Sequence, residues 1–187
     1  MAEITRSTSL QELAALISQA LEQAGILATL SGGSAVSLYT DNRYQSHDLD
    51  FVTSADPRRL QPVVAALGFV PTASKRLYEH PQTEWLVEFP AGPLGFGHRV
   101  VDALQLETLE TPWGPLRVIT PTLCVMDRLA AFCHWQDRQC WDQAQLVAQA
   151  HPVDWQQLHD WAAKEGLDPA TWQRFRVEAK APEAGPQ

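Results

Sequence analysis

One segment, residues 26–53, constrains the fold most, because two short apolar runs in it are separated by a glycine-rich turn and a polar loop. Each apolar run is long enough for a buried strand, and the residues after the glycines can begin a helix. The pattern therefore predicts, in chain order, a strand, a tight turn, a helix, a loop and a second strand: 26–30, 31–34, 35–39, 40–47 and 49–53.

The flanking segments add helices and strands around this unit. Ser9 and Glu12 form an S-x-x-E capping box at the start of a helix over 9–24, and Asp56-Pro57 opens another that ends before Gly68. Strands are expected at 76–80 and 84–89, a loop at 90–97, and a hairpin over 106–120 at a sheet edge. From residue 121 the pattern is helical.

This order predicts an α/β (α+β) fold, with a mixed sheet flanked by helices and followed by a C-terminal helical part. We divide the chain into an α/β domain over 1–120 and a helical subdomain over 121–177. The last segment, 178–187, is rich in Ala, Pro, Glu and Gly, so we expect it to be a disordered tail.

The composition excludes several classes of protein. The 187 residues carry a net charge of −8, the opposite sign from a general nucleic-acid coat protein. No apolar run approaches the roughly 20 residues that span a bilayer, and the N-terminus lacks a signal-peptide pattern. Three cysteines, without the close C-x-x-C pairing of structural zinc sites, predict reduced core thiols. We therefore expect a cytoplasmic protein with no membrane partner.

Two carboxylates stand at the start of the second strand of this segment. Asp48 and Asp50 are two residues apart, so in a strand they project from the same face. Adjacent carboxylates repel one another unless a cation or a proton lies between them. Mg²⁺ prefers oxygen ligands and binds through one or two carboxylates together with substrate phosphates. By itself, a D-x-D pattern is equally compatible with a solvated acidic turn.

The glycine-rich turn supplies the second half of a nucleotide-site pattern. A strand that leads through Gly32-Gly33-Ser34 into a helix leaves free N–H groups at a helix N-terminus, which favours phosphate. The glycines allow close approach of the ligand, and the Ser34 hydroxyl can donate to a terminal phosphate. The alternative is a tight turn without a ligand, but that reading does not explain the acidic pair on the next strand.

These residues resemble the signature of a known superfamily. Gly32-Gly33-Ser34-Ala35 followed by Arg43-Tyr44-Gln45-Ser46-His47-Asp48-Leu49-Asp50-Phe51 is similar to the motif of polymerase-β-type nucleotidyltransferases. Within that superfamily the segment most resembles the minimal bacterial AbiEii-like branch, which includes toxins of toxin–antitoxin pairs. The resemblance implies the fold of this superfamily and a nucleotide site formed by Gly32, Gly33, Ser34, Arg43 and Arg128.

The resemblance also implies a third acidic residue on a later strand. We prefer Glu88, because it interrupts the apolar run Trp85 to Phe89 and a charge in such a strand needs a partner. Asp102 competes for this role if Val100 and Val101 form a strand, although a helix cap is the simpler interpretation of Asp102. The metal ligands and catalytic residues would then be Asp48, Asp50 and Glu88.

The helical half departs from the family pattern. Arg128 stands where the family usually has Lys, and Arg138-Gln139 with Asp142 fits its K-D-x-x-D segment only in part. An Arg keeps the positive charge that neutralises phosphate but lacks the compact ammonium of Lys. For Arg128, a surface residue without a ligand is an equally good interpretation.

We therefore predict a Mg²⁺-dependent nucleotidyltransferase that transfers a nucleoside monophosphate from an NTP to a hydroxyl acceptor. The acceptor could be a tRNA end, a protein or a small molecule, and an antitoxin protein is a possible partner. If RNA is the acceptor, four cations should border the acidic pair: Arg58, Arg59, Lys75 and Arg76. The alternative is a catalytically inactive nucleotide-binding or regulatory protein on the same scaffold.

Overall fold

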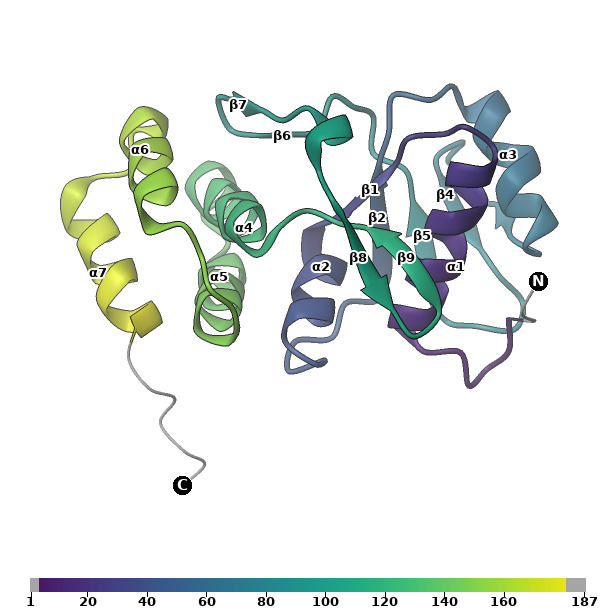
Figure 1. Ribbon diagram of the computed structural model, residues 1–187, viewed down its shortest axis with the longest axis horizontal. Coiled ribbons are helices and arrows are strands. Elements are labelled where there is room, and N and C mark those ends of the chain that lie inside the picture. Colours follow the sequence, from purple (N-terminus) through teal and green to yellow (C-terminus); the bar gives the residue numbers. More distant parts are fainter. Residues whose placement is uncertain (1–3, 181–187) are drawn as a thin grey trace.

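A five-stranded mixed sheet forms the centre of the part that precedes residue 121 in the computed structural model, which describes residues 4–180 (Figure 1). The strands lie in the order β1-β2-β5-β4-β3. Their bounds are Thr29–Ser31 (β1), Asp48–Val52 (β2), Val70–Pro71 (β3), Leu77–Glu79 (β4) and Leu86–Glu88 (β5). Only β2 and β5 run parallel, and the other neighbours are antiparallel. The chain therefore has the mixed α/β architecture that the sequence predicts.

Seven helices accompany this sheet in the described residues. Those before residue 121 are α1, Leu10–Gln23; α2, Gly32–Tyr39; and α3, Pro57–Ala66. The remaining four, which gather at one end of the molecule in Figure 1, are α4, Pro121–Trp135; α5, Arg138–Ala150; α6, Trp155–Glu165; and α7, Pro169–Lys180. Helix α4 contacts α2, so the helical half packs directly beside the glycine-rich turn.

Local sequence signals explain where several helices begin. The Ser9 hydroxyl accepts a hydrogen bond from the Glu12 amide at 3.2 Å, as the capping box predicts. Asp56 caps α3 in the same way, with Pro57 in its first turn. Thr120 and Pro121 repeat this arrangement at the start of α4. A side-chain acceptor at each of these starts satisfies an amide that has no partner inside the helix.

One continuous apolar core joins the sheet to the helices. Alternate residues of β2, Leu49 and Phe51, are fully buried, whereas Asp48, Asp50 and Val52 on the opposite face are half-buried. The same buried cluster continues into the helical half, where it includes side chains of α4, α5, α6 and α7. The alternation along β2 therefore places one face of the strand in the core and leaves the acidic face available for chemistry.

Short strands account for most differences from the expected elements. The segment predicted as a loop contains β6, Gly95–Phe96, which pairs with β7, Arg99–Val100. The expected hairpin is present as β8, Thr108–Thr111, and β9, Gly114–Arg117, but it forms a separate two-stranded sheet. A backbone hydrogen bond from Ile119 to Leu30 attaches the end of this hairpin to β1. A two-residue strand leaves no periodic pattern to detect.

The β6–β7 hairpin is attached to the helical half by hydrogen bonds. The Trp161 indole of α6 donates to the Phe96 carbonyl at 3.1 Å. At the end of α6, the nearly buried Glu165 carboxylate accepts from the His98 amide at 2.9 Å and lies 2.7 Å from Nε2 of His134. Burial would raise the pKa of Glu165, but these hydrogen bonds outweigh it and lower the pKa. Glu165 therefore ties the hairpin to α4 and α6.

The start of the predicted tail needs correction. Helix α7 continues to Lys180, and Glu178 accepts hydrogen bonds from Trp141 at 3.0 Å and from Arg174 at 2.8 Å. Residues 178–180 therefore belong to a packed helix and not to a disordered tail, while residues 181–187 lie outside the described part. Two of the cysteines, Cys124 and Cys140, are buried, as expected for core thiols. No helix among the described residues is both long and apolar enough to cross a bilayer.

Candidate active site

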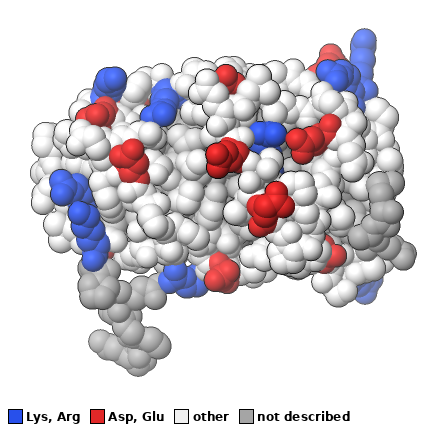
Figure 2. Space-filling model, viewed as in Figure 1, with Lys and Arg blue, Asp and Glu red and all other residues white. Residues whose placement is uncertain are grey.

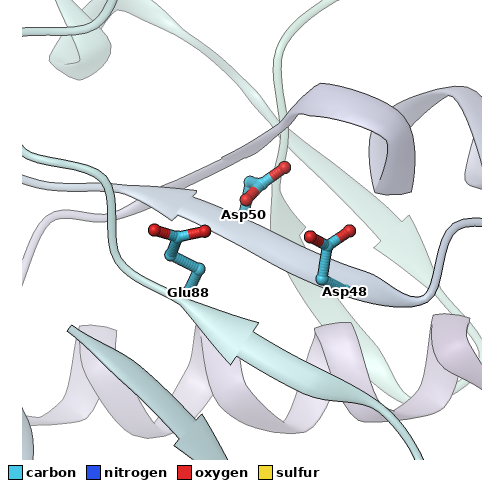
Figure 3. Close-up of side chains that lie close together, drawn as sticks. All are labelled: Asp48, Asp50 and Glu88. Atoms are coloured by element: carbon cyan, nitrogen blue, oxygen red, sulfur yellow. The ribbon is translucent and has the colours of Figure 1, made fainter. Parts of the chain in front are cut away.

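Three carboxylates meet on the face of the sheet opposite the core (Figure 3). Asp48 and Asp50 project from β2, and Glu88 projects from the neighbouring β5, where it pairs directly with Asp50 in the parallel register. One oxygen of each residue can be chosen so that all three lie within 4.8 Å of one another. The structure thus brings together the three residues that the sequence predicts as metal ligands.

Asp102, the competing candidate, has another role. Its side chain accepts a hydrogen bond from the Leu104 amide at 3.0 Å and caps a 3-10 turn, Ala103–Gln105. This is the helix-cap interpretation, and it leaves Glu88 as the third carboxylate of the cluster.

The loop before β2 fixes the position of Asp48. The buried Ser46 hydroxyl donates to the Asp48 carboxylate at 2.8 Å, and the Ser46 amide donates to the Ser37 hydroxyl of α2 at 2.8 Å. Because both serines are buried, the carboxylate is held by a rigid connection to α2.

Asp50 lies in an acidic environment. Its half-burial, followed by the charges of Asp48 and Glu88, raises its pKa from 3.8 to about 7. Arg128 acts in the opposite direction, but it does not offset the other effects. A carboxyl that retains its proton near neutral pH is the expected property of an acidic cluster that lacks a compensating cation.

The donor set of this cluster fits a hard divalent cation. All three residues offer oxygen atoms, which Mg²⁺ prefers, and the half-buried positions leave room for substrate oxygens as further ligands. The raised pKa of Asp50 shows that the cluster favours added positive charge, supplied either by a proton or by a metal ion. The residues present therefore fit Mg²⁺.

Gly32 is required by the position of Asp50. Its φ of +65° lies in the left-handed region, and a Cβ at this position would collide with Oδ2 of Asp50. Any other residue would be strained and would also displace a carboxylate of the cluster. The glycine-rich turn and the acidic strand are therefore a single structural unit.

The first residues of α2 differ in one respect from the expected phosphate cradle. The Ser34 hydroxyl is fully buried, donates to the Ser31 carbonyl at 2.9 Å and accepts from the Asp50 amide at 3.4 Å. It thus holds β1, α2 and β2 together. To donate a hydrogen bond to phosphate, the Ser34 hydroxyl would have to leave these partners. The preceding residue, Gly33, is only half-buried.

Sequence analysis missed a polar group from the helical half that reaches this turn. Oδ2 of Asp127 in α4 accepts from the Gly32 amide at 3.1 Å and from Nη2 of Arg128 at 2.7 Å. Nη1 of the largely buried Arg128 donates to Gln143 of α5 at 3.3 Å. Burial raises the pKa of the nearby Tyr44 phenol, and the charge of Arg128 partly offsets that rise. The available signal was the adjacent pair of opposite charges, Asp127-Arg128, within an otherwise buried run of α4.

The other predicted cations form hydrogen bonds with backbone carbonyls or line a surface hollow. Arg43 is exposed in the loop that precedes β2, and its Nε donates to the Thr40 carbonyl at 3.4 Å. Guanidinium groups of Arg59 and Arg76 donate to backbone carbonyls. Arg58 and Lys75 line a separate surface hollow of about 740 Å³ beside the start of α3.

Of the four cations expected to border the acidic pair, Arg76 lies beside the end of β5, where its guanidinium donates to the carbonyl of Phe89, the residue after Glu88. Described Lys and Arg side chains on the face shown in Figure 2 are scattered among acidic ones and do not gather into a stripe. That these cations guide an RNA acceptor to the site stays a prediction.

The fold is shared with known nucleotidyltransferase-like proteins, although no protein-family model matches the chain and no curated protein matches its sequence. An antigenic nucleotidyltransferase-like protein from Paracoccidioides brasiliensis matches with a TM-score of 0.61 at 15% identity, covering 95% of this chain and 94% of that one. The antibiotic-resistance factor ANT(2″)-Ia matches with a TM-score of 0.53 at 15% identity, covering 92% and 99% respectively. The chain therefore has a nucleotidyltransferase-like fold.

Proposed function

We propose that this protein is a Mg²⁺-dependent nucleotidyltransferase that transfers a nucleoside monophosphate from a nucleoside triphosphate to a hydroxyl acceptor. The observation that carries the proposal is the meeting of Asp48, Asp50 and Glu88 on adjacent parallel strands beside the glycine-rich turn. By fold-level analogy the same activity is compatible with the structure, since one of the neighbours named above is described as nucleotidyltransferase-like.

The roles of the carboxylates follow from their positions. Asp48 and Asp50, two residues apart on β2, would hold the metal, and Glu88 on β5 would accept the proton of the attacking hydroxyl. Mg²⁺, when bound, supplies neutralisation of the phosphate charge. Because Asp50 has a raised pKa, it must lose its proton before it can act as a ligand, so metal affinity should increase as the pH rises through 7.

The phosphates would bind at the start of α2 and beside α4. The amides of Gly32 and Gly33 belong to the first turn of a helix, where backbone dipoles favour anions, and Arg128 adds a positive charge next to Asp50. We keep Arg43 as a further phosphate contact because of its place in the motif. In this proposal the Ser34 hydroxyl positions β2 against α2 and does not bind phosphate.

The proposal of a non-catalytic nucleotide-binding protein is weaker. That alternative would be favoured if Glu88 lay far from the two aspartates, but the three carboxylates lie within reach of one metal ion. Membership of the AbiEii-like branch, with an antitoxin partner, is a finer proposal that rests only on the motif from Gly32 to Phe51.

The test is label transfer from NTPs in the presence of Mg²⁺ to a panel of acceptors. The panel contains tRNA, proteins and small hydroxylated molecules, and it includes antibiotics because ANT(2″)-Ia is an antibiotic-resistance factor. We expect one acceptor class to be labelled by the wild type and not by Glu88→Gln. Glu79→Gln is the matched control, since it makes the same change on an exposed residue of the same sheet. Equal labelling by the wild type and Glu88→Gln would contradict the proposal.

A further inference from the structure

One oxygen atom of Asp127 binds two donors, the amide of Gly32 at the start of α2 and the guanidinium of Arg128 in α4. Oδ2 accepts from the Gly32 amide at 3.1 Å and from the Arg128 guanidinium at 2.7 and 3.2 Å. The contact joins residues 95 positions apart and therefore connects α4 of the helical half to the glycine-rich turn.

This carboxylate acts as the side-chain cap of α2. The N-cap residue itself, Ser31, makes no side-chain cap hydrogen bond, and its hydroxyl lies instead toward the Asp50 carbonyl. An acidic group from another helix thus takes the place that an N-cap oxygen usually has. The first amide of α2 already donates to a carboxylate oxygen, so the start of this helix can bind a negatively charged oxygen.

The same carboxylate also adds negative charge to an acidic site. Asp127 raises the pKa of Asp50, in the same direction as Asp48 and Glu88, whereas Arg128 lowers it. The side chains of Asp127 and Arg128 are only 19% and 15% exposed, so solvent screens their charges weakly. A phosphate group that approaches Gly32 and Arg128 therefore meets donors that are occupied and a carboxylate of its own sign.

We propose that Asp127 is an affinity-determining residue of the nucleotide site: it binds the Gly32 amide and Arg128 in competition with the triphosphate, which must displace it. This inference rests on the proposed function, because it takes these two donors as phosphate ligands. It adds that the helical half regulates the site, since displacement of Asp127 breaks the hydrogen bond between α4 and the first residue of α2.

Competition predicts opposite effects on stability and on affinity. Asp127→Asn removes a charged acceptor from Arg128 and Gly32, so the protein should unfold at a lower temperature. The same change removes a competing anion, and the triphosphate should bind about tenfold tighter or more. A residue that only supports the fold, or only positions Arg128 for phosphate, would lower the stability and the affinity together.

The experiment measures both quantities for the same variants. Calorimetric titration with inorganic triphosphate and with ATP, each with and without Mg²⁺, gives the affinity, and thermal unfolding gives the stability. Asp127→Asn and Asp127→Ala are compared with the wild type. Asp160→Asn is the matched control, because it removes the same charge from an exposed position on α6. We expect tighter binding and lower stability in both Asp127 variants and neither effect in the control.

The possible results separate this inference from the proposed function. Binding by the wild type with equal or weaker binding by folded Asp127 variants would overturn the inference and leave the proposed function intact. Absence of triphosphate binding in the wild type and in both variants would overturn both.

If neither variant folds, amide and carboxylate NMR of the wild type decides the question. We expect triphosphate to shift the Gly32 amide and the Asp127 side-chain carboxylate together. Nucleotide binding that leaves both signals unchanged would overturn the inference.

Discussion

Replacing Asp50 by Asn should remove a pH dependence of stability that the acidic cluster builds into the metal-free protein. Half-burial and the neighbouring charges of Asp48 and Glu88 raise the pKa of Asp50 from 3.8 to about 7. A carboxyl whose pKa is raised in the folded state binds a proton more tightly there than in the unfolded chain. Its contribution to stability is therefore fully present below about pH 4 and is lost as the pH rises through 7.

The size of this effect follows from the shift. Each pKa unit corresponds to about 1.4 kcal/mol, so the free energy of unfolding should fall by up to about 4 kcal/mol between acidic and alkaline pH. This is an upper limit, because solvent reaches part of the half-buried carboxyl and reduces the effect. For a chain of this length, the unfolding temperature changes by roughly 2–4 °C per kcal/mol.

Thermal unfolding by circular dichroism, in the presence of a chelator from pH 5 to 8.5, measures this dependence. The wild type and Glu79→Gln should become less stable with rising pH relative to Asp50→Asn. All three proteins contain the same six histidines, so the difference between their curves isolates Asp50. Parallel curves for the wild type and Asp50→Asn would refute the proposed charge environment of the cluster.

Two further substitutions test the structural supports of the site. Gly32→Ala should lower the free energy of unfolding by more than Gly25→Ala does. Both residues have φ near +65°, but only at Gly32 would the added Cβ collide with Asp50. Equal losses of stability in the two variants would contradict the predicted collision. Glu165→Gln should lose about 1–3 kcal/mol at neutral pH, measured by urea unfolding, since it weakens the attachment of the β6–β7 hairpin. Because the pKa of Glu165 is lowered, this contribution is present above about pH 4.5 and disappears as the pH falls below it, so a variant deficit that persists at low pH would count against the assignment.

The acidic site could be predicted because each of its residues leaves a local signal. Asp48 and Asp50 share a face through their spacing of two, and Glu88 stands out as a charge within an apolar strand. The direct pairing of Asp50 with Glu88 depends on the register of two parallel strands, which spacing alone does not determine. The sequence predicts only a third acidic residue on a later strand, and the observed register places that residue, Glu88, beside Asp50.

The contacts from the helical half were not predictable in the same way. Asp127 reaches Gly32 across 95 positions of the chain, and no local pattern specifies which helix packs against the start of α2. From its residue type alone, Ser34 could donate a hydrogen bond to phosphate. In the structure its hydroxyl is buried between β1 and β2 and is hydrogen-bonded to backbone groups of both strands. Tertiary packing thus decides which polar groups near a motif remain free to bind a ligand.

A comparison of two labels on ATP tests whether nucleotidyl transfer takes place at the acidic cluster. The wild type is incubated with Mg²⁺, the acceptor panel and ATP labelled either at the α-phosphorus or at the γ-phosphorus. Our prediction is that the acceptor receives label from the α position only, and that Glu88→Gln abolishes this transfer while Glu79→Gln does not. Label received from the γ position, or transfer by Glu88→Gln at the wild-type rate, would contradict it.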